Sequence, residues 1–281
     1  MKNILVPVKG GEGSKPLLDT AVSIARRFDA HIEFLHVRPD PQDRLPYGSL
    51  AIPDSMKQSI LDSAERSADE RTNRARHLCE EYCIRHDIPL VKGAPIGKLS
   101  ASWREDTGRK AAIVAEHGRV HDLLIMLQPE GKPKATLECA LTETGRPVLV
   151  VPRVEHRCEA ANIGIGWNGS AEASRAVADA MPSVRSADHV TIFTTEKRER
   201  MPPTADELVT YLGCYGVNVT KQLLDTESRS VGEALLEESN AANVDMLVIG
   251  AYSGRTLRDV IFGGVTRHML TSADVPVFMA H

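Results

Sequence analysis

The sequence predicts an α/β protein of two consecutive domains, each a five-stranded parallel sheet with helices on both faces. Short apolar runs without polar alternation are typical of strands that are buried on both faces. Amphipathic segments separate these runs, and strands alternating with helices indicate a doubly wound sheet. The plan then recurs 159 residues further along the chain, so that the second half is a copy of the first.

The repeat is clearest at the first strand of each half. Residues 3–8, followed by Lys-Gly-Gly at 9–11, match residues 162–167, followed by Asn-Gly-Ser at 168–170. Apolar residues at helical spacing follow in both halves. The complete plan predicts ten strands, at residues 3–8, 31–37, 100–105, 122–127, 147–151, 162–167, 188–194, 218–224, 245–250 and 276–279.

The first half also contains a long predicted helix at about 55–86. The strand that follows it, 100–105, has the weakest signal, because Pro89, Pro95 and Gly97 interrupt the approach to it. In the second half, residues 265–272 predict a short helix before the last strand.

A polar segment without periodicity, 153–161, marks the boundary between the halves. We expect domains at 1–153 and 161–281. The last strand of each domain ends at an edge of its sheet, and pairing or packing of these two edges would form an internal pseudo-dimer. A further homodimer stays open.

The composition narrows the classes of function. Apolar residues make up 42% of the 281 residues, charged residues 26%, and the net charge is −4, so no basic character indicates nucleic acid binding. No apolar run reaches the ~18 residues of a membrane span, and the N-terminus lacks a signal peptide. Five cysteines, an odd number, fit a reducing compartment. We expect a cytoplasmic protein.

A ligand site is expected at the carboxyl ends of the first and fourth strands of each domain, where the strand order reverses. In the second half, this edge brings Asn168 and Gly169 opposite the segment that begins at Gly250. Glycines recur before the short helix, at Gly263 and Gly264. The first-turn amides of that helix, on Gly264, Val265 and Thr266, would form an anion site, to which nearby arginines add charge: Arg255, Arg258 and Arg267.

The same glycines have a second interpretation. Glycine flanks helices for reasons of turn geometry and capping throughout proteins. An isolated glycine pattern is therefore a weak motif for phosphate binding.

At these residues the chain resembles the universal stress protein family, in its tandem form. The family motif reads G-x-x-G, nine residues, then G-[S/T], and it aligns with Gly250, Ser253, Gly263 and Gly264. The resemblance implies the adenine nucleotide α-hydrolase-like fold with flavodoxin-like layering. It also implies that ATP or AMP binds in the second domain, with Thr195 and its neighbours near the base, Asn168 near the ribose and the glycine loop on the phosphates.

The chain departs from the family pattern at several positions. Asn168 stands where the family has aspartate, and Lys9 reverses the charge at the same place in the first half. Ser253 replaces a motif glycine, and Gly264 lacks the motif hydroxyl. In the first half, 25 residues separate Asp122 from the proline before the last strand, against 31 in the second, and Leu127 stands where Gly250 does. We interpret the first half as a structural partner, in which Lys9 could still bind some other anion.

We therefore predict a stress-response regulatory protein that binds an adenine nucleotide in its second half, with Mg²⁺ as an optional companion of the phosphates. No general base or metal carboxylate is apparent in the loop, so hydrolysis would be slow at most. Gly263→Asp should abolish binding. The alternative is an interaction module without nucleotide, with both sites degenerate and a protein partner that the sequence does not identify.

Other candidates have weaker support. Cys79, Cys83 and His86 share one face of the long helix and could hold Zn²⁺, although packing is the commoner role of such residues. The charged run at 197–200 reads as a solvated loop after a strand, and Trp167 as a packing residue. Neither a nucleophile elbow nor a P-loop occurs.

Overall fold

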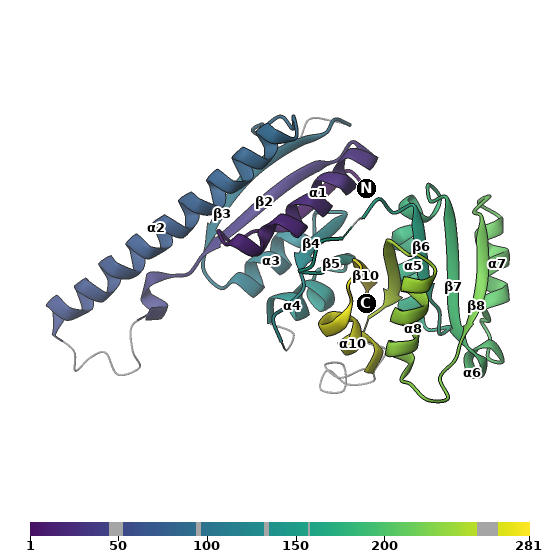
Figure 1. Cartoon of the computed structure of the whole chain (residues 1–281). Coiled ribbons are helices and arrows are strands. Elements are labelled where there is room, and N and C mark those ends of the chain that lie inside the picture. Colours follow the sequence, from purple (N-terminus) through teal and green to yellow (C-terminus); the bar gives the residue numbers. More distant parts are fainter. Residues whose placement is uncertain (45–52, 94–96, 132–134, 157, 252–263) are drawn as a thin grey trace.

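The computed structural model describes residues 1–44, 53–93, 97–131, 135–156, 158–251 and 264–281. Its strands form one ten-stranded sheet in the order β3-β2-β1-β4-β5-β10-β9-β6-β7-β8 (Figure 1). The first half contains β1 (Asn3–Pro7), η1 (Glu12–Ser14), α1 (Lys15–Phe28), β2 (His31–Arg38), η2 (Pro41–Arg44), α2 (Asp54–Arg85), β3 (Ser100–Thr107), α3 (Lys110–Gly118), β4 (Leu123–Leu127), α4 (Ala135–Glu143) and β5 (Val148–Val151).

The second half repeats the order of the strands and longer helices, with α6 at the place of η2 and no counterpart of η1 among the described residues. Its elements are β6 (Asn162–Gly166), α5 (Ala171–Val184), β7 (His189–Thr195), α6 (Glu196–Glu199), α7 (Ala205–Gly213), β8 (Val219–Leu224), α8 (Val231–Ala241), β9 (Met246–Gly250), α10 (Gly264–Ser272) and β10 (Val277–Ala280). The ten predicted strands are confirmed, each within two residues at either end, including the weakly signalled β3.

Each half places its first strand beside its fourth, as a doubly wound sheet requires. β1 pairs with β4 in parallel, with Ile4 opposite Leu123, and β6 pairs with β9, with Ile163 opposite Met246. The switch point of the strand order therefore lies between these strands in both halves.

The repeat extends to single hydrogen bonds. The Asp122 carboxylate accepts from the backbone amides of residues 2 and 3, at 2.6 and 3.2 Å. The Asp245 carboxylate accepts from the amides of residues 161 and 162, at 3.0 and 3.2 Å. In both halves, an aspartate before the fourth strand thus fixes the start of the first.

The two halves join through their last strands. β10 pairs antiparallel with β5, with Val277 opposite Val150 and Phe278 opposite Leu149. The predicted pairing of the two terminal edges is confirmed, and it turns two five-stranded sheets into one continuous sheet without leaving either edge open.

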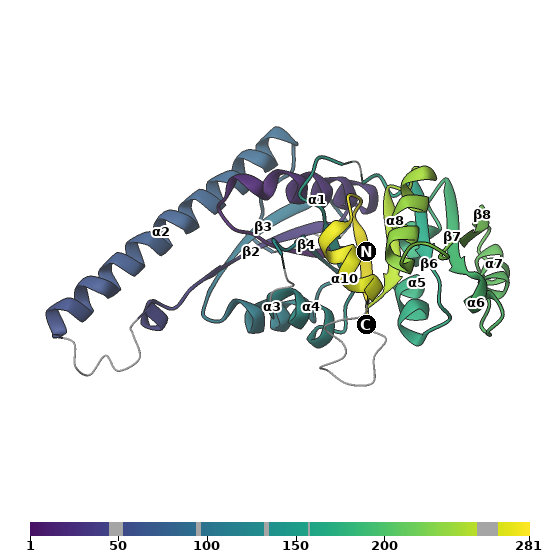
Figure 2. The ribbon, with the colours of Figure 1, turned by 60° about the horizontal axis from the view of Figure 1, so that its bottom comes forward.

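Helices cover both faces of this sheet, so the core forms two layers (Figure 2). One layer packs α1, α2, α5 and α7 against the sheet, and the other packs α3, α4, α8 and α10. Only the part of α2 from Ala68 to Cys83 supplies buried residues, and the start of this helix extends beyond the sheet (Figure 1). Within the described residues, no helix has the length and apolar character needed to cross a membrane.

Candidate functional site

A cavity of about 340 Å³ lies at the carboxyl ends of β6 and β9. It is the predicted location, because the strand order reverses there. Six predicted site residues line it: Asn168, Thr195, Gly250, Gly264, Val265 and Thr266. Ser253, Gly263, Arg255 and Arg258 lie outside the described residues.

Asn168 begins a tight turn into α5. Its side-chain oxygen accepts from the Ser170 amide at 3.0 Å, and the Ser170 hydroxyl caps α5 by accepting from the Ala173 amide at 3.1 Å. Gly169, between them, has a φ of +73°, which favours glycine. Because the turn uses the Asn168 oxygen, this side chain offers a ligand its NH₂ group, a donor. Gly169 shapes the turn and is not among the lining residues.

Gly250 has a steric role that the sequence left open. A Cβ at this position would lie 2.4 Å from the Ala173 nitrogen and 2.6 Å from the Glu172 carbonyl carbon. The backbone that approaches Gly250 closely is therefore the first turn of α5. Gly264 differs, because a Cβ there would meet no described atom within 4 Å.

The first turn of α10 forms one wall of the cavity. It contributes Gly264, Val265 and Thr266, and the Thr266 side chain is buried. The amides at the start of a helix carry no intrahelical partner, and the helix dipole places partial positive charge there. This wall can therefore hold an anion.

Thr194, next to the predicted Thr195, also lines the cavity. Thr194 is 1% exposed, and its hydroxyl oxygen has no hydrogen-bond partner among the described residues. An unpartnered buried hydroxyl is costly. The neighbouring Thr195 oxygen accepts from the Arg198 amide at 3.4 Å and so caps α6.

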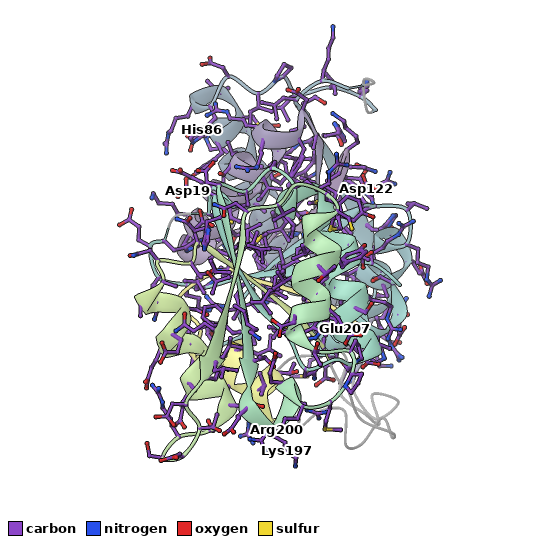
Figure 3. The ribbon with its side chains drawn as sticks, turned by 90° about the vertical axis from the view of Figure 1, so that its right-hand side faces the viewer. Asp19, His86, Asp122, Lys197, Arg200 and Glu207 are labelled. Carbon is purple, nitrogen blue, oxygen red and sulfur yellow. The ribbon has the colours of Figure 1, made fainter. Side chains whose placement is uncertain are left out.

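Residues 197–200 were expected to be a solvated loop, and Lys197, Arg198 and Arg200 are exposed as predicted, but the prediction of a loop is wrong. The chain folds there into α6, and Lys197 and Arg198 line the cavity. Figure 3 shows Lys197 and Arg200 at the lower end of the second half. Their position directly after a strand at the switch-point edge was the signal available in the sequence.

Apolar side chains form the rest of the wall, from β7, β8, α8 and β9: Phe193, Leu224, Val231, Leu235 and Ile249. Trp167 also lines the cavity. It is buried as predicted, with its indole nitrogen donating to the Pro203 carbonyl at 3.0 Å. None of the described lining residues is a carboxylate or a histidine.

The thiols of Cys79 and Cys83 are buried in α2. Burial raises the pKa of Cys79 to about 12 and that of Cys83 to about 11, so both thiols are protonated at neutral pH. His86 stacks on Tyr82, with 4.8 Å between the ring centroids. Among the described residues no three metal-ligating side chains cluster, which favours the packing interpretation.

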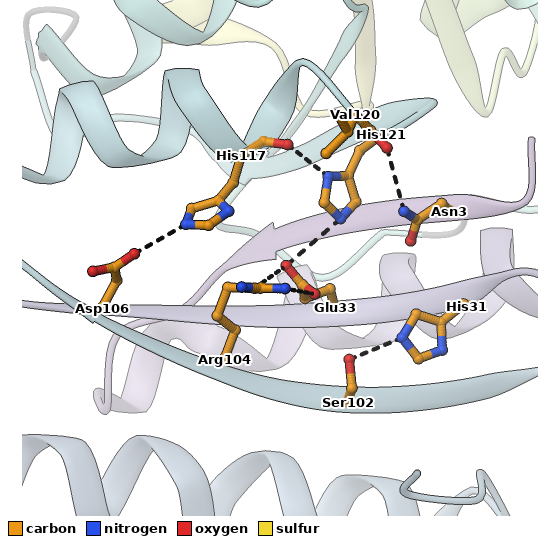
Figure 4. A network of polar contacts seen from close by, with 9 residues as sticks. All are labelled: Asn3, His31, Glu33, Ser102, Arg104, Asp106, His117, Val120 and His121. Atoms are coloured by element: carbon orange, nitrogen blue, oxygen red, sulfur yellow. Dashed lines mark hydrogen bonds and ion pairs between the residues drawn. The ribbon is translucent and has the colours of Figure 1, made fainter. Parts of the chain in front are cut away.

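A second polar cluster, which the sequence did not indicate, lies between α3 and strands β2 and β3 (Figure 4). Arg104 holds Glu33 through two bonds, at 2.7 and 3.1 Å. The His121 Nδ1 donates to the His117 carbonyl at 2.8 Å, and its Nε2 lies 3.7 Å from Glu33. Burial lowers the pKa of His121 despite the nearby carboxylate, so this ring is neutral at physiological pH.

His31 belongs to the same cluster. Its two ring nitrogens lie 2.9 Å from the Ser100 hydroxyl and 2.8 Å from the Ser102 hydroxyl. Burial lowers the pKa of His31 as well. Because both nitrogens face hydroxyls and neither faces a carboxylate, the Ser102–His31 pair lacks the acid that orients the base of a catalytic triad.

Comparisons with known proteins agree with this fold. A universal stress protein from Archaeoglobus fulgidus DSM 4304 superimposes with a TM-score of 0.69 at 15% identity, over 99% of this chain and 97% of that one. A protein of unknown function from Pseudomonas aeruginosa PAO1 gives a TM-score of 0.57 at 15% identity, over 100% and 92%. A comparison with curated proteins found no match.

The family assignment comes from the sequence itself. The model of the universal stress protein family matches residues 1–184 and 216–281, which is most of the chain and includes both halves. The matched segments include Asn168 and the whole span from Gly250 to α10. This chain belongs to the universal stress protein family.

Proposed function

We propose that this protein is a regulatory, stress-response protein that binds an adenine nucleotide in the cavity of its second half. The observation that carries the proposal is the set of residues that line this cavity. An anion-binding helix start, two cations and a set of apolar side chains line the same cavity. A nucleotide has the matching parts, a polyanionic tail and a flat, largely apolar base.

The phosphates would bind at the first turn of α10. The backbone amides of Gly264 and Val265 supply donors with the positive end of the helix dipole behind them. Lys197 and Arg198, from α6, add positive charge to the same cavity. The NH₂ group of Asn168 would donate to a ribose oxygen.

The base would lie against the apolar wall from β7, β8 and α8. Phe193 and Leu235 are buried there and exclude water. The Thr194 hydroxyl, unpartnered among the described residues, can form its hydrogen bond with a polar edge of the base. Ligand binding would thus remove a cost that the ligand-free protein carries.

Binding without rapid turnover fits the same residues. Hydrolysis needs a group that positions or deprotonates water, and no carboxylate or histidine lines the described part of the cavity. Mg²⁺ would arrive with the phosphates, because the lining residues offer it no carboxylate ligand. The bound nucleotide would then act as a signal that stabilises one state of the protein.

Titration calorimetry with ATP and with AMP tests the proposal. Gly264→Asp places a negative charge at the start of α10, where a Cβ meets no atom of the described residues within 4 Å, and Gly264→Asn is its neutral, isosteric control. We expect micromolar binding to the wild type, about tenfold or greater weakening in Gly264→Asp, and near wild-type binding in Gly264→Asn. Absence of heat with millimolar ATP and AMP would overturn the proposal and favour a nucleotide-independent interaction module.

A further inference from the structure

The helix that forms the anion-binding wall of the cavity, α10, is held at its other end by the first half of the chain. The side-chain amide nitrogen of Gln128, in the first half, donates to the Ala273 carbonyl at 3.2 Å and to the Met269 carbonyl at 3.4 Å. Met269 lies in the last turn of α10, and Ala273 directly follows the helix. In both views of the ribbon, α10 lies where the two halves meet (Figure 1, Figure 2).

This contact caps the C-terminal end of α10. The last carbonyls of a helix lack intrahelical donors and carry the negative end of the helix dipole. Because both partners of the Gln128 side chain are carbonyls, its NH₂ group, with two donors, must face the helix. Ala273 is buried, and a buried carbonyl without a donor is costly. The first half therefore supplies hydrogen bonds that the end of α10 needs.

The backbone of Gln128 is itself anchored. Its amide donates to the Val151 carbonyl at 2.7 Å, and its carbonyl accepts from the Arg153 Nε at 2.9 Å. Val151 ends β5, and Arg153 lies two residues further along the chain. The half-buried side chain of Gln128 thus extends to α10 from a backbone position that the sheet of the first half fixes.

The second half does not return this contact. Ala251 occupies the corresponding position after the fourth strand, since its amide donates to the Ala280 carbonyl at 2.8 Å, as the Gln128 amide does to that of Val151. Alanine has no side-chain donor, so position 251 cannot form the same bond to α4. The support therefore passes from the first half to the second, where the larger cavity lies.

The support reaches the cavity through the length of α10. This helix has nine residues, so its two ends are only about 13 Å apart. Its middle packs closely on α8, where a Cβ on Gly232 would lie 2.9 Å from the His268 Cβ. A short helix transmits a displacement along its axis as a rigid element. A shift at the capped end therefore also moves the Gly264 and Val265 amides, which must lie about 2.9 Å from a phosphate oxygen to bind it.

We propose that Gln128 is a positioning residue for the phosphate end of the nucleotide site. It is not among the described residues that line the cavity, and it acts through α10. This inference rests on the nucleotide binding proposed above. It adds that the first half sets the affinity for the phosphate group and leaves the contacts of the base unchanged, so that AMP and adenosine respond differently to loss of the cap.

The test variant is Gln128→Met, which keeps the length of the side chain and removes its donors, and Gln128→Lys restores a donor. The control, Gln222→Met, removes a half-buried amide that donates to Glu238 at 2.7 Å within the second half. Calorimetry measures AMP and adenosine binding, and amide hydrogen exchange of residues 264–272 measures the stability of α10 without ligand.

We expect Gln128→Met to speed exchange in α10 and to weaken AMP binding about fivefold, with adenosine binding unchanged. Gln128→Lys should restore AMP binding to near the wild-type value. Gln222→Met should leave the exchange of α10 and the binding of both ligands unchanged.

Three outcomes would contradict the positioning role. Equal α10 exchange or equal AMP affinity in the wild type and Gln128→Met would overturn it and leave nucleotide binding in the second half intact. An equal fall in AMP and adenosine affinity would also overturn it, because the loss would then be a general loss of structure. Absence of AMP binding in the wild type would overturn the proposed function, and the positioning role with it, whatever the exchange shows.

Discussion

At the scale of single residues, Thr194 allows a stability effect and a binding effect to be separated. Thr194→Val keeps the shape of the side chain and removes a buried hydroxyl that has no partner among the described residues. We expect the free energy of unfolding of the ligand-free protein to rise by about 1 kcal/mol, while nucleotide affinity falls. Urea denaturation and calorimetry measure the two effects. Ser183→Ala is the matched control, because Ser183 is also buried and unpartnered but does not line the cavity.

The Ser183→Ala control should gain stability without any change in nucleotide affinity. An unchanged affinity in Thr194→Val would instead show that the hydroxyl does not contact the ligand. The sequence places Thr194 beside the predicted Thr195, but it could not show that the hydroxyl lacks a partner, because this depends on the neighbouring strands and helices. Asn168 and the first turn of α10 could be predicted, since parallel strands bring their carboxyl ends to one edge.

At the scale of elements, the contact between β9 and α5 depends on Gly250. Gly250→Ala would force a Cβ to within 2.4 Å of the Ala173 nitrogen, so we expect the protein to lose about 3 kcal/mol of stability. Gly264→Ala is the control and should be neutral or slightly stabilising, because a Cβ there meets no described atom within 4 Å and alanine favours helix. Thermal denaturation measures both. A Gly250→Ala protein as stable as the wild type would show that the Ala173 backbone does not lie this close to Gly250.

The elements also show how far sequence patterns reach. The ten strands were predictable because burial on both faces gives each a continuous apolar run. α6 was not, because its four residues are too few for a helical period and Thr195 caps it only in the folded chain. The close approach of α5 to Gly250 could not be predicted from the local sequence, because it depends on how α5 packs against β9.

At the scale of the whole molecule, the β5–β10 pair should control association. The separated segment 161–281 would expose the β10 edge that Val148–Val151 covers in the full chain. We expect this segment to self-associate through β10, antiparallel, as the two halves pair now. Light scattering of the segment checks this, and a monomeric, folded segment would contradict it.

Global stability should also depend on pH through the buried histidines of the first half. Burial lowers the pKa values of His31, His36 and His121 in the folded protein. The unfolded chain then binds more protons below about pH 6.5, so stability falls as the pH drops through that value. Urea denaturation at about pH 7.5 and pH 5.5 measures the loss. His121→Gln should reduce this loss of stability, and His77→Gln, at an exposed histidine, should not. An equal loss in both variants would contradict the assignment of the pH dependence to the buried histidines.

The central claim is that the second half holds an adenine nucleotide between Asn168 and the first turn of α10. A crystal structure of the full chain grown with millimolar AMP tests it most directly. The account predicts the phosphate at the Gly264 and Val265 amides, the ribose beside Asn168, and the base against Phe193 and Thr194. An empty cavity at saturating AMP, or AMP bound elsewhere, would contradict it.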